Sequence, residues 1–135
     1  MRFVLAALLL AALPAFAQYG PPSPAVDSGP GYNTSFQPLG KTANLAASTS
    51  SATIALSTSP NQVQVYNSTT GIAFVIFCTS SSCTAHAGST GTSTSDYPVA
   101  PGAVIVMTVP ANTTYAAAVL STSTGAVYFT PGQGL

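Results

Sequence analysis

The sequence predicts a small all-β domain, a β-sandwich or jelly-roll-like module of about 6–8 strands, and three observations lead to this prediction. From residue 38 onward, short apolar runs alternate with clusters of Ser, Thr, Gly, Asn and Pro, as they do in chains of short strands and turns. No stretch shows the 3.6-residue apolar period of an amphipathic helix. Finally, 47% of the residues are hydrophobic, which is enough for a folded core although only 3% are charged.

The N-terminus has the pattern of a signal peptide. Met1-Arg2 supplies a positive charge, residues 3–12 form an apolar run, and Ala15-Phe16-Ala17 matches the small-x-small pattern of a cleavage site. The apolar run is shorter than the ~20 residues that a transmembrane helix needs. We therefore predict a signal peptide at 1–17, cleavage after Ala17, and no transmembrane span in the mature protein. An uncleaved anchor is the alternative.

Residues 18–37 predict an extended arm ahead of the folded domain. The segment contains Gly20-Pro21-Pro22-Ser23-Pro24 and Gly29-Pro30-Gly31, with almost no aliphatic side chain to bury. Prolines at this density disfavour helix and sheet and favour polyproline-like stretches. We therefore place the folded domain at 38–135, behind a flexible linker that is able to lie over a neighbouring subunit.

Seven candidate strands follow from the turn-bounded apolar runs of the domain. Gln62-Val63-Gln64-Val65-Tyr66 alternates strictly, so we expect both valines on the core side and both glutamines toward solvent. Asn67-Ser68-Thr69-Thr70-Gly71 then predicts a turn. The candidate strands are 42–46, 52–56, 62–66, 72–78, 104–109, 115–120 and 126–130.

Two of these runs, 72–77 and 104–107, are apolar at every position. Each would place apolar side chains on both faces of a sheet, whereas a sandwich strand ordinarily buries one face. We favour another subunit as the cover of the second face, and enclosure by the Ser/Thr-rich loops is the alternative. The candidates for core or interface positions are Phe74, Ile76, Ile105 and Met107.

Cys78 and Cys83 flank four Ser and Thr residues and predict a disulfide at a hairpin tip. An export signal implies an oxidising compartment, in which such a bond persists. Closing so short a loop should contribute about 2 kcal/mol of stability. A redox-active pair is disfavoured because the spacing is not Cys-x-x-Cys and no βαβ pattern surrounds it.

The scarcity of charge excludes several partners. Removal of residues 1–17 leaves Lys41 as the one strong cation against Asp27 and Asp96, a formal net charge of −1, and the chain has no Glu. Without a basic groove or a Lys/Arg cluster, we expect neither a nucleic-acid partner nor binding to anionic lipid. Surfaces near zero net charge tend to associate, so we expect a homo-oligomer or a larger protein assembly.

Catalytic and metal-binding groups are also scarce. A pair of carboxylates for glycoside hydrolysis would have to include Asp27 of the arm. A Ser-His-Asp triad from His86 and Asp96 lacks the Gly-x-Ser-x-Gly elbow. A metal site from Cys78, Cys83, His86 and Asp96 fits no standard spacing and competes with the disulfide. We therefore expect no enzyme, assign no catalytic, cofactor-binding or metal-ligating residue, and assign no small-molecule ligand.

Four segments of the domain resemble a known group of proteins. They are Asp96–Val106 and Ala126–Leu135, with Phe36–Gly40 and Val63–Asn67 earlier in the chain. They are similar to small β-rich proteins encoded among the structural genes of tailed bacteriophages and prophages. The resemblance implies a virion component, such as a capsid decoration or surface protein. The signal peptide and the cysteine pair depart from that pattern, because virion proteins normally assemble in the reducing cytoplasm.

We therefore expect a non-enzymatic structural or assembly protein, and a phage virion decoration or surface component is the form that the resemblance implies. The alternative is an exported binding or adhesive β-domain. The signal peptide predicts export to the periplasm, the cell surface or the medium, whereas the resemblance implies a place in the virion. A functional amyloid built on the uncharged run 73–77 is a further alternative.

Overall fold

The computed structural model describes residues 36–88 and 95–134, and within these ranges the chain forms nine β-strands and no helix. The predicted signal peptide, residues 18–35 of the predicted arm, residues 89–94 and Leu135 lie outside the described residues. In the described part, no helix is long and apolar enough to cross a membrane. The strands are β1 (Phe36–Pro38), β2 (Ala43–Ala47), β3 (Ala52–Ala55), β4 (Gln62–Asn67), β5 (Ala73–Cys78), β6 (Tyr97–Val99), β7 (Val104–Thr108), β8 (Tyr115–Leu120) and β9 (Gly125–Gly134).

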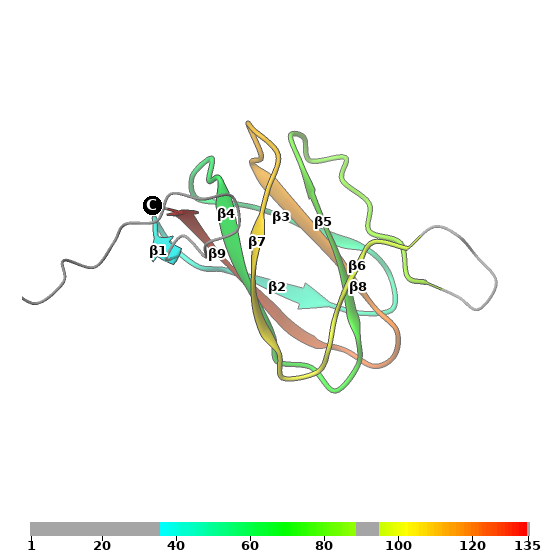
Figure 1. Ribbon diagram of the computed structural model, residues 1–135. Helices are drawn as coiled ribbons and strands as arrows, with labels where there is room; N and C mark the ends of the chain where they lie inside the picture. Colours follow the sequence, from blue (N-terminus) through cyan, green and yellow to red (C-terminus); the bar gives the residue numbers. More distant parts are fainter. Residues whose placement is uncertain (1–35, 89–94, 135) are drawn as a thin grey trace, which may run out of the picture. The chain divides into compact units, whose positions relative to one another are not determined.

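The strands form two antiparallel sheets that share one core, which confirms the predicted all-β sandwich (Figure 1). The five-stranded sheet, here called sheet A, has the order β1-β9-β4-β7, and β2 pairs with β9 on the same edge as β1. The four-stranded sheet, here called sheet B, has the order β3-β8-β5-β6. In Figure 1, β4, β7 and β9 lie in one layer, and β5, β6 and β8 lie in the other.

The core lies between the two sheets and consists of inward-facing side chains from both. In β4 the expected alternation is confirmed, because Val63 and Val65 are fully buried while Gln64 between them and Tyr66 after them are more exposed. Phe129 of sheet A and Phe77 of sheet B meet edge to face across the core, with ring centroids 6.1 Å apart. Small alanines of β8 complete the opposite wall of this cluster.

Six of the predicted strands agree with the structure to within one or two residues, but the last strand continues to Gly134 and two short strands were not predicted. Pro131 has no N–H to donate, which disfavours it inside a central strand. Instead β9 passes through it and pairs with β1, which begins inside the predicted arm. Gly132 permits this pairing, because a Cβ at that position would overlap the ring of Phe36.

The second short strand, β6, ends at a tight turn that leads into β7. The N–H of Ala103 donates to the carbonyl of Ala100 at 3.1 Å, and Gly102 has a φ of 72°. Pro101 and Gly102 therefore occupy the two central positions of a type II turn, where proline and a positive-φ glycine are favoured. This turn carries the chain from sheet B to sheet A.

The side chain of Asn67 links the end of β4 to the turn before β5 and to the end of β6. Its side chain is fully buried, and its Nδ2 donates to the carbonyls of Gly71 at 2.9 Å and Val99 at 3.0 Å. Its Oδ1 accepts from the N–H and the hydroxyl of Thr69 at 3.0 and 2.7 Å. The predicted turn at 67–71 thus does connect β4 to β5, and its first residue also holds β6 in place.

Candidate functional site

The outer face of sheet B is covered by the chain itself. After β5 the chain reverses, and residues 79–88, here called the cover segment, pack on that face. Cys83 and Ala85 of the segment are buried, whereas Thr84 and His86 are exposed. An extended backbone alternates its side chains in this way, so two small residues face the sheet and two polar ones face solvent.

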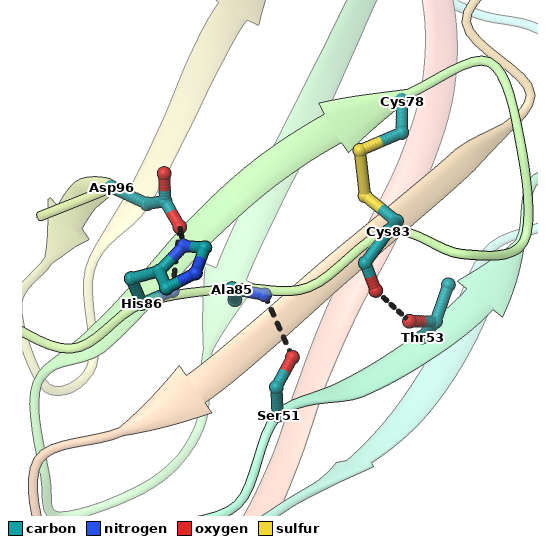
Figure 2. A network of polar contacts seen from close by, with 7 residues as sticks. All are labelled: Ser51, Thr53, Cys78, Cys83, Ala85, His86 and Asp96. Carbon is teal, nitrogen blue, oxygen red and sulfur yellow. Dashed lines mark hydrogen bonds and ion pairs between the residues drawn. A yellow bond between two sulfur atoms is a disulfide. The ribbon is translucent and has the colours of Figure 1, made fainter.

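Three of the contacts that hold the cover segment lie close together in Figure 2. The predicted disulfide is confirmed: Cys78 at the end of β5 is bonded to Cys83, with their Cα atoms 5.8 Å apart. The hydroxyl of Thr53 in β3 donates to the carbonyl of Cys83 at 2.6 Å. The hydroxyl of Ser51 accepts from the N–H of Ala85 at 2.7 Å. The segment is therefore attached to both β5 and the β3 edge of sheet B.

The expectation that another subunit covers the second face of the 72–77 run is wrong for this strand. Phe74 is 8% exposed and packs with Cys83 and Ala85, and Ile76 is partly buried against the same cluster. The other buried members of the cluster, Ala117 and Val119, come from the outer face of β8. A Ser/Thr-rich loop thus encloses this face, because its small alternating residues fit against the sheet and the disulfide keeps them there.

His86 and Asp96 join the cover segment to the chain that enters β6. Asp96 Oδ2 accepts from the backbone N–H of His86 at 2.6 Å and lies 3.4 Å from His86 Nδ1. The N–H of Asp96 donates in return to the carbonyl of His86 at 3.2 Å. The two sulfurs that the metal alternative required are bonded to each other. Within residues 36–88 and 95–134, no three His, Cys, Asp or Glu side chains are grouped so that they could hold a metal ion.

The outer face of sheet A, in contrast, carries exposed apolar side chains. Because the valines of β4 are buried, Tyr66 of that strand faces outward. In β7, Ile105 and Met107 pack on the core, so Val104 and Val106 face outward as well. Six residues on this face of β4, β7 and β9 are here called the outer patch: Gln64, Tyr66, Val104, Val106, Tyr128 and Thr130.

The outer patch is arranged in rows that run across the sheet. Tyr66 lies between Val104 of β7 and Tyr128 of β9, and the two tyrosine rings stack with centroids 5.7 Å apart and planes inclined by 17°. Val104 is 56% exposed, Val106 is 45% exposed and Tyr66 is 40% exposed. Exposed aliphatic and aromatic side chains therefore adjoin one another instead of being scattered singly.

The outer patch can bind a partner through apolar contacts and hydrogen bonds. Strands β4, β7 and β9 contain no Asp, Glu, Lys or Arg. Polar groups are supplied by Gln64 and by Thr130, whose hydroxyl is 2.9 Å from the hydroxyl of Thr42. Such a face suits an uncharged partner that buries apolar area, and it offers no ionic attraction to a charged one.

None of the four candidate interface residues from the sequence lies in the outer patch. Phe74 and Ile76 lie under the cover segment, and Ile105 and Met107 pack partly buried against the main core. The neighbouring valines of β7 are the exposed ones. The run 104–107 indicated that one set of apolar side chains would face away from the core of its own domain, but only the pairing of β7 with β4 decides which set.

Residues 36–88 and 95–134 thus define an all-β sandwich domain in which the chain covers the outer face of sheet B and leaves the outer patch of sheet A exposed. Comparisons with protein-family models, with curated proteins and with solved structures find no match to this chain.

Proposed function

We propose that this protein is a non-enzymatic structural or assembly component, which docks onto other protein subunits through the outer patch. The observation that carries the proposal is the exposure of Val104 and Val106 beside the stacked tyrosine pair. Contiguous exposed apolar side chains mark interaction sites, and tyrosine is enriched in protein interfaces. Burial of this patch by a partner would remove apolar area from water, which is the main driving force of association.

The partner in this proposal is a protein with an uncharged, largely apolar surface. Nucleic acids and anionic lipids attract proteins through lysine and arginine, and the strands of the outer patch contain neither residue. A capsid or tail surface is one such partner, and the resemblance to phage structural proteins favours it. In that form the domain acts as a virion decoration or surface component.

A charge placed in the outer patch tests the proposal. Light scattering measures the particle mass of the protein purified from the cell that produces it, together with any bound partner. Tyr66→Lys should lower this mass, because burying the lysine ammonium group at an interface costs free energy. Ser80→Lys adds the same charge to an exposed position of the cover segment and serves as the matched control. Circular dichroism should show both variants folded. An unchanged mass for Tyr66→Lys would contradict the proposal.

An exported binding or adhesive β-domain is the second candidate function, and the Cys78–Cys83 disulfide favours it. Disulfides persist in oxidising compartments and are rare in the cytosol, where virion proteins assemble. Cell fractionation followed by non-reducing mass spectrometry separates the two candidates. Oxidised protein in the envelope or medium supports export, whereas protein that co-sediments only with phage particles supports the virion role.

A further inference from the structure

We infer that the free edge of β7 pairs with the same edge of a second copy of this chain, in an antiparallel register centred on Val106. The inference deepens the proposed function and rests on it, since it names a first partner for the assembly. It is carried by the backbone of β7, by the sequence of its edge, and by the way the other sheet edges are protected.

Two hydrogen bonds that bracket β7 identify the backbone groups that face β4. The carbonyl of Ala103 accepts from the N–H of Asn67 at 3.1 Å, and the N–H of Val109 donates to the carbonyl of Asn61 at 3.0 Å. Directly opposed residues of an antiparallel pair alternate between hydrogen-bonded and non-bonded pairs. The odd-numbered residues of β7 therefore bond to β4.

The even-numbered residues of β7 point their backbone N–H and C=O groups away from β4, toward the free edge of sheet A. Sheet A ends at β7, so no strand of the described residues pairs with this edge. An unpaired row of donors and acceptors is a template for another strand. The residues that present these groups are Val104, Val106 and Thr108.

The other sheet edges carry features that discourage pairing, whereas β7 does not. Pro38 lies in β1 and Pro98 lies in β6, and a proline removes a donor from the edge. Strands β2 and β3 follow each other directly and contact each other where the chain passes from sheet A to sheet B. Strand β7 contains no proline and no charged residue, which are the usual protections of an edge strand.

A second copy fits this edge because the sequence of β7 is self-complementary in the antiparallel register. Val106 lies opposite its own copy, Val104 lies opposite Thr108, and Ile105 lies opposite Met107. The even-numbered residues then form the hydrogen-bonded pairs, so the groups left free by β4 satisfy one another. All these residues pack well across strands, and no like charges meet. The two-fold contact closes on itself and joins the two outer patches into one surface.

Cross-linking at designed cysteines tests the register. Opposed residues in hydrogen-bonded pairs have Cα atoms about 5.5 Å apart, which suits a disulfide. Val106→Cys should therefore form a covalent dimer on mild oxidation, with peptide mapping to identify the bond. Val104→Cys alone should not, because its partner is Thr108, and adding Thr108→Cys should restore the cross-link. Cross-linking by Val104→Cys alone but not by Val106→Cys would overturn this register.

A proline at the centre of the edge tests the pairing itself. Val106→Pro removes the outward N–H and leaves the hydrogen bonds to β4, so a folded monomer is expected in light scattering. Val106→Thr keeps the N–H and should remain dimeric. Thermal melting reports the fold of each variant. If Val106→Pro does not fold, the cross-linking of the cysteine variants tests whether the β7 edges pair.

The outcomes separate this inference from the proposed function. A wild-type protein that stays monomeric at all concentrations, or a dimer that Val106→Pro leaves intact, overturns the pairing of β7 edges. If Tyr66→Lys then still lowers the mass of a particle formed with another protein, or of a dimer formed elsewhere, the docking role of the outer patch still stands. If Tyr66→Lys leaves the particle mass unchanged while the Val106 series behaves as expected, the edge pairing stands and the docking role fails.

Discussion

The two outer faces of the sandwich are built on similar apolar strands, but they differ in whether the chain covers them. Strand β5 of sheet B and strand β7 of sheet A are both apolar at nearly every position. On sheet B, the chain that follows β5 doubles back and buries Phe74 and its neighbours. On sheet A, the chain that follows β7 continues through a turn at 109–114 into β8, and the valines of β7 stay exposed. The second apolar face of β5 is thus covered by the chain itself, whereas that of β7 is left exposed among the described residues.

The difference between the faces divides their roles. Burying a large apolar side chain contributes about 1.5–3 kcal/mol, so the covered face of sheet B adds to folding stability. In the proposed function, burial of the exposed side chains of sheet A contributes to association instead. Substitutions under the cover segment should therefore lower the melting temperature, and substitutions in the outer patch should change the particle mass.

The largest effect is expected at the ring that the cover segment buries. Phe74→Ala should lower the free energy of unfolding by about 3 kcal/mol, because it removes a buried ring and leaves a cavity. Ile72→Ala, at a 40% exposed position just before the same strand, is the control and should cost less than about 1 kcal/mol. Urea unfolding measures both. Equal losses for the two variants would show that the cover segment does not shield β5.

Removal of the disulfide should have the next largest effect. The double variant Cys78→Ala, Cys83→Ala should lose about 2 kcal/mol, because the unfolded chain is no longer cross-linked across a short loop. Hydrogen exchange should show faster exchange at Ala85, whose N–H is held by Ser51, than in the wild type. Unchanged protection of the cover segment would mean that its hydrogen bonds alone hold it.

A smaller effect is expected at the hydrogen bonds of the cover segment. Ser51→Ala removes the acceptor of the Ala85 N–H and should lower stability by about 1 kcal/mol. Ser80→Ala is the matched control, since the Ser80 hydroxyl is exposed and bonds only to the hydroxyl of Ser82 among the contacts described. Thermal denaturation at matched concentrations compares the two. A loss in the control as large as that of Ser51→Ala would contradict the bridging role of this bond.

The smallest effect on stability is expected in the outer patch. Tyr66→Ser should change the free energy of unfolding of the isolated chain by no more than about 1 kcal/mol, because the ring is 40% exposed. The same variant should reduce the particle mass in light scattering, since it removes half of the stacked tyrosine pair. A large loss of stability with an unchanged particle mass would show that Tyr66 stabilises the fold and does not contribute to docking.

Much of this architecture follows from local sequence signals. The alternation at 62–66 predicted the inward valines of β4, and the turn-rich boundaries located most strands. The spacing of the two cysteines, together with a predicted export signal, predicted their bond. Strand β6 was missed although Pro101-Gly102 is a type II turn signal, because three residues that include a proline rarely indicate a strand.

The candidate site was less accessible to prediction from the sequence. The tyrosines of the stacked pair, Tyr66 and Tyr128, are far apart in the chain and meet only because β4 and β9 pair. In β7, a shift of one residue in pairing would exchange the exposed valines for Ile105 and Met107. No local feature of the run 104–107 distinguishes the two arrangements.

The sequence by itself determined the fold class, the positions of most strands and the disulfide, because these depend on local alternation, turn residues and the spacing of cysteines. Only the tertiary structure decided which apolar face is covered and which is bare. That outcome depends on the register of strands distant in sequence and on the path of residues 79–88 across sheet B. Both are set by packing between segments far apart in the chain, for which a local pattern holds no information.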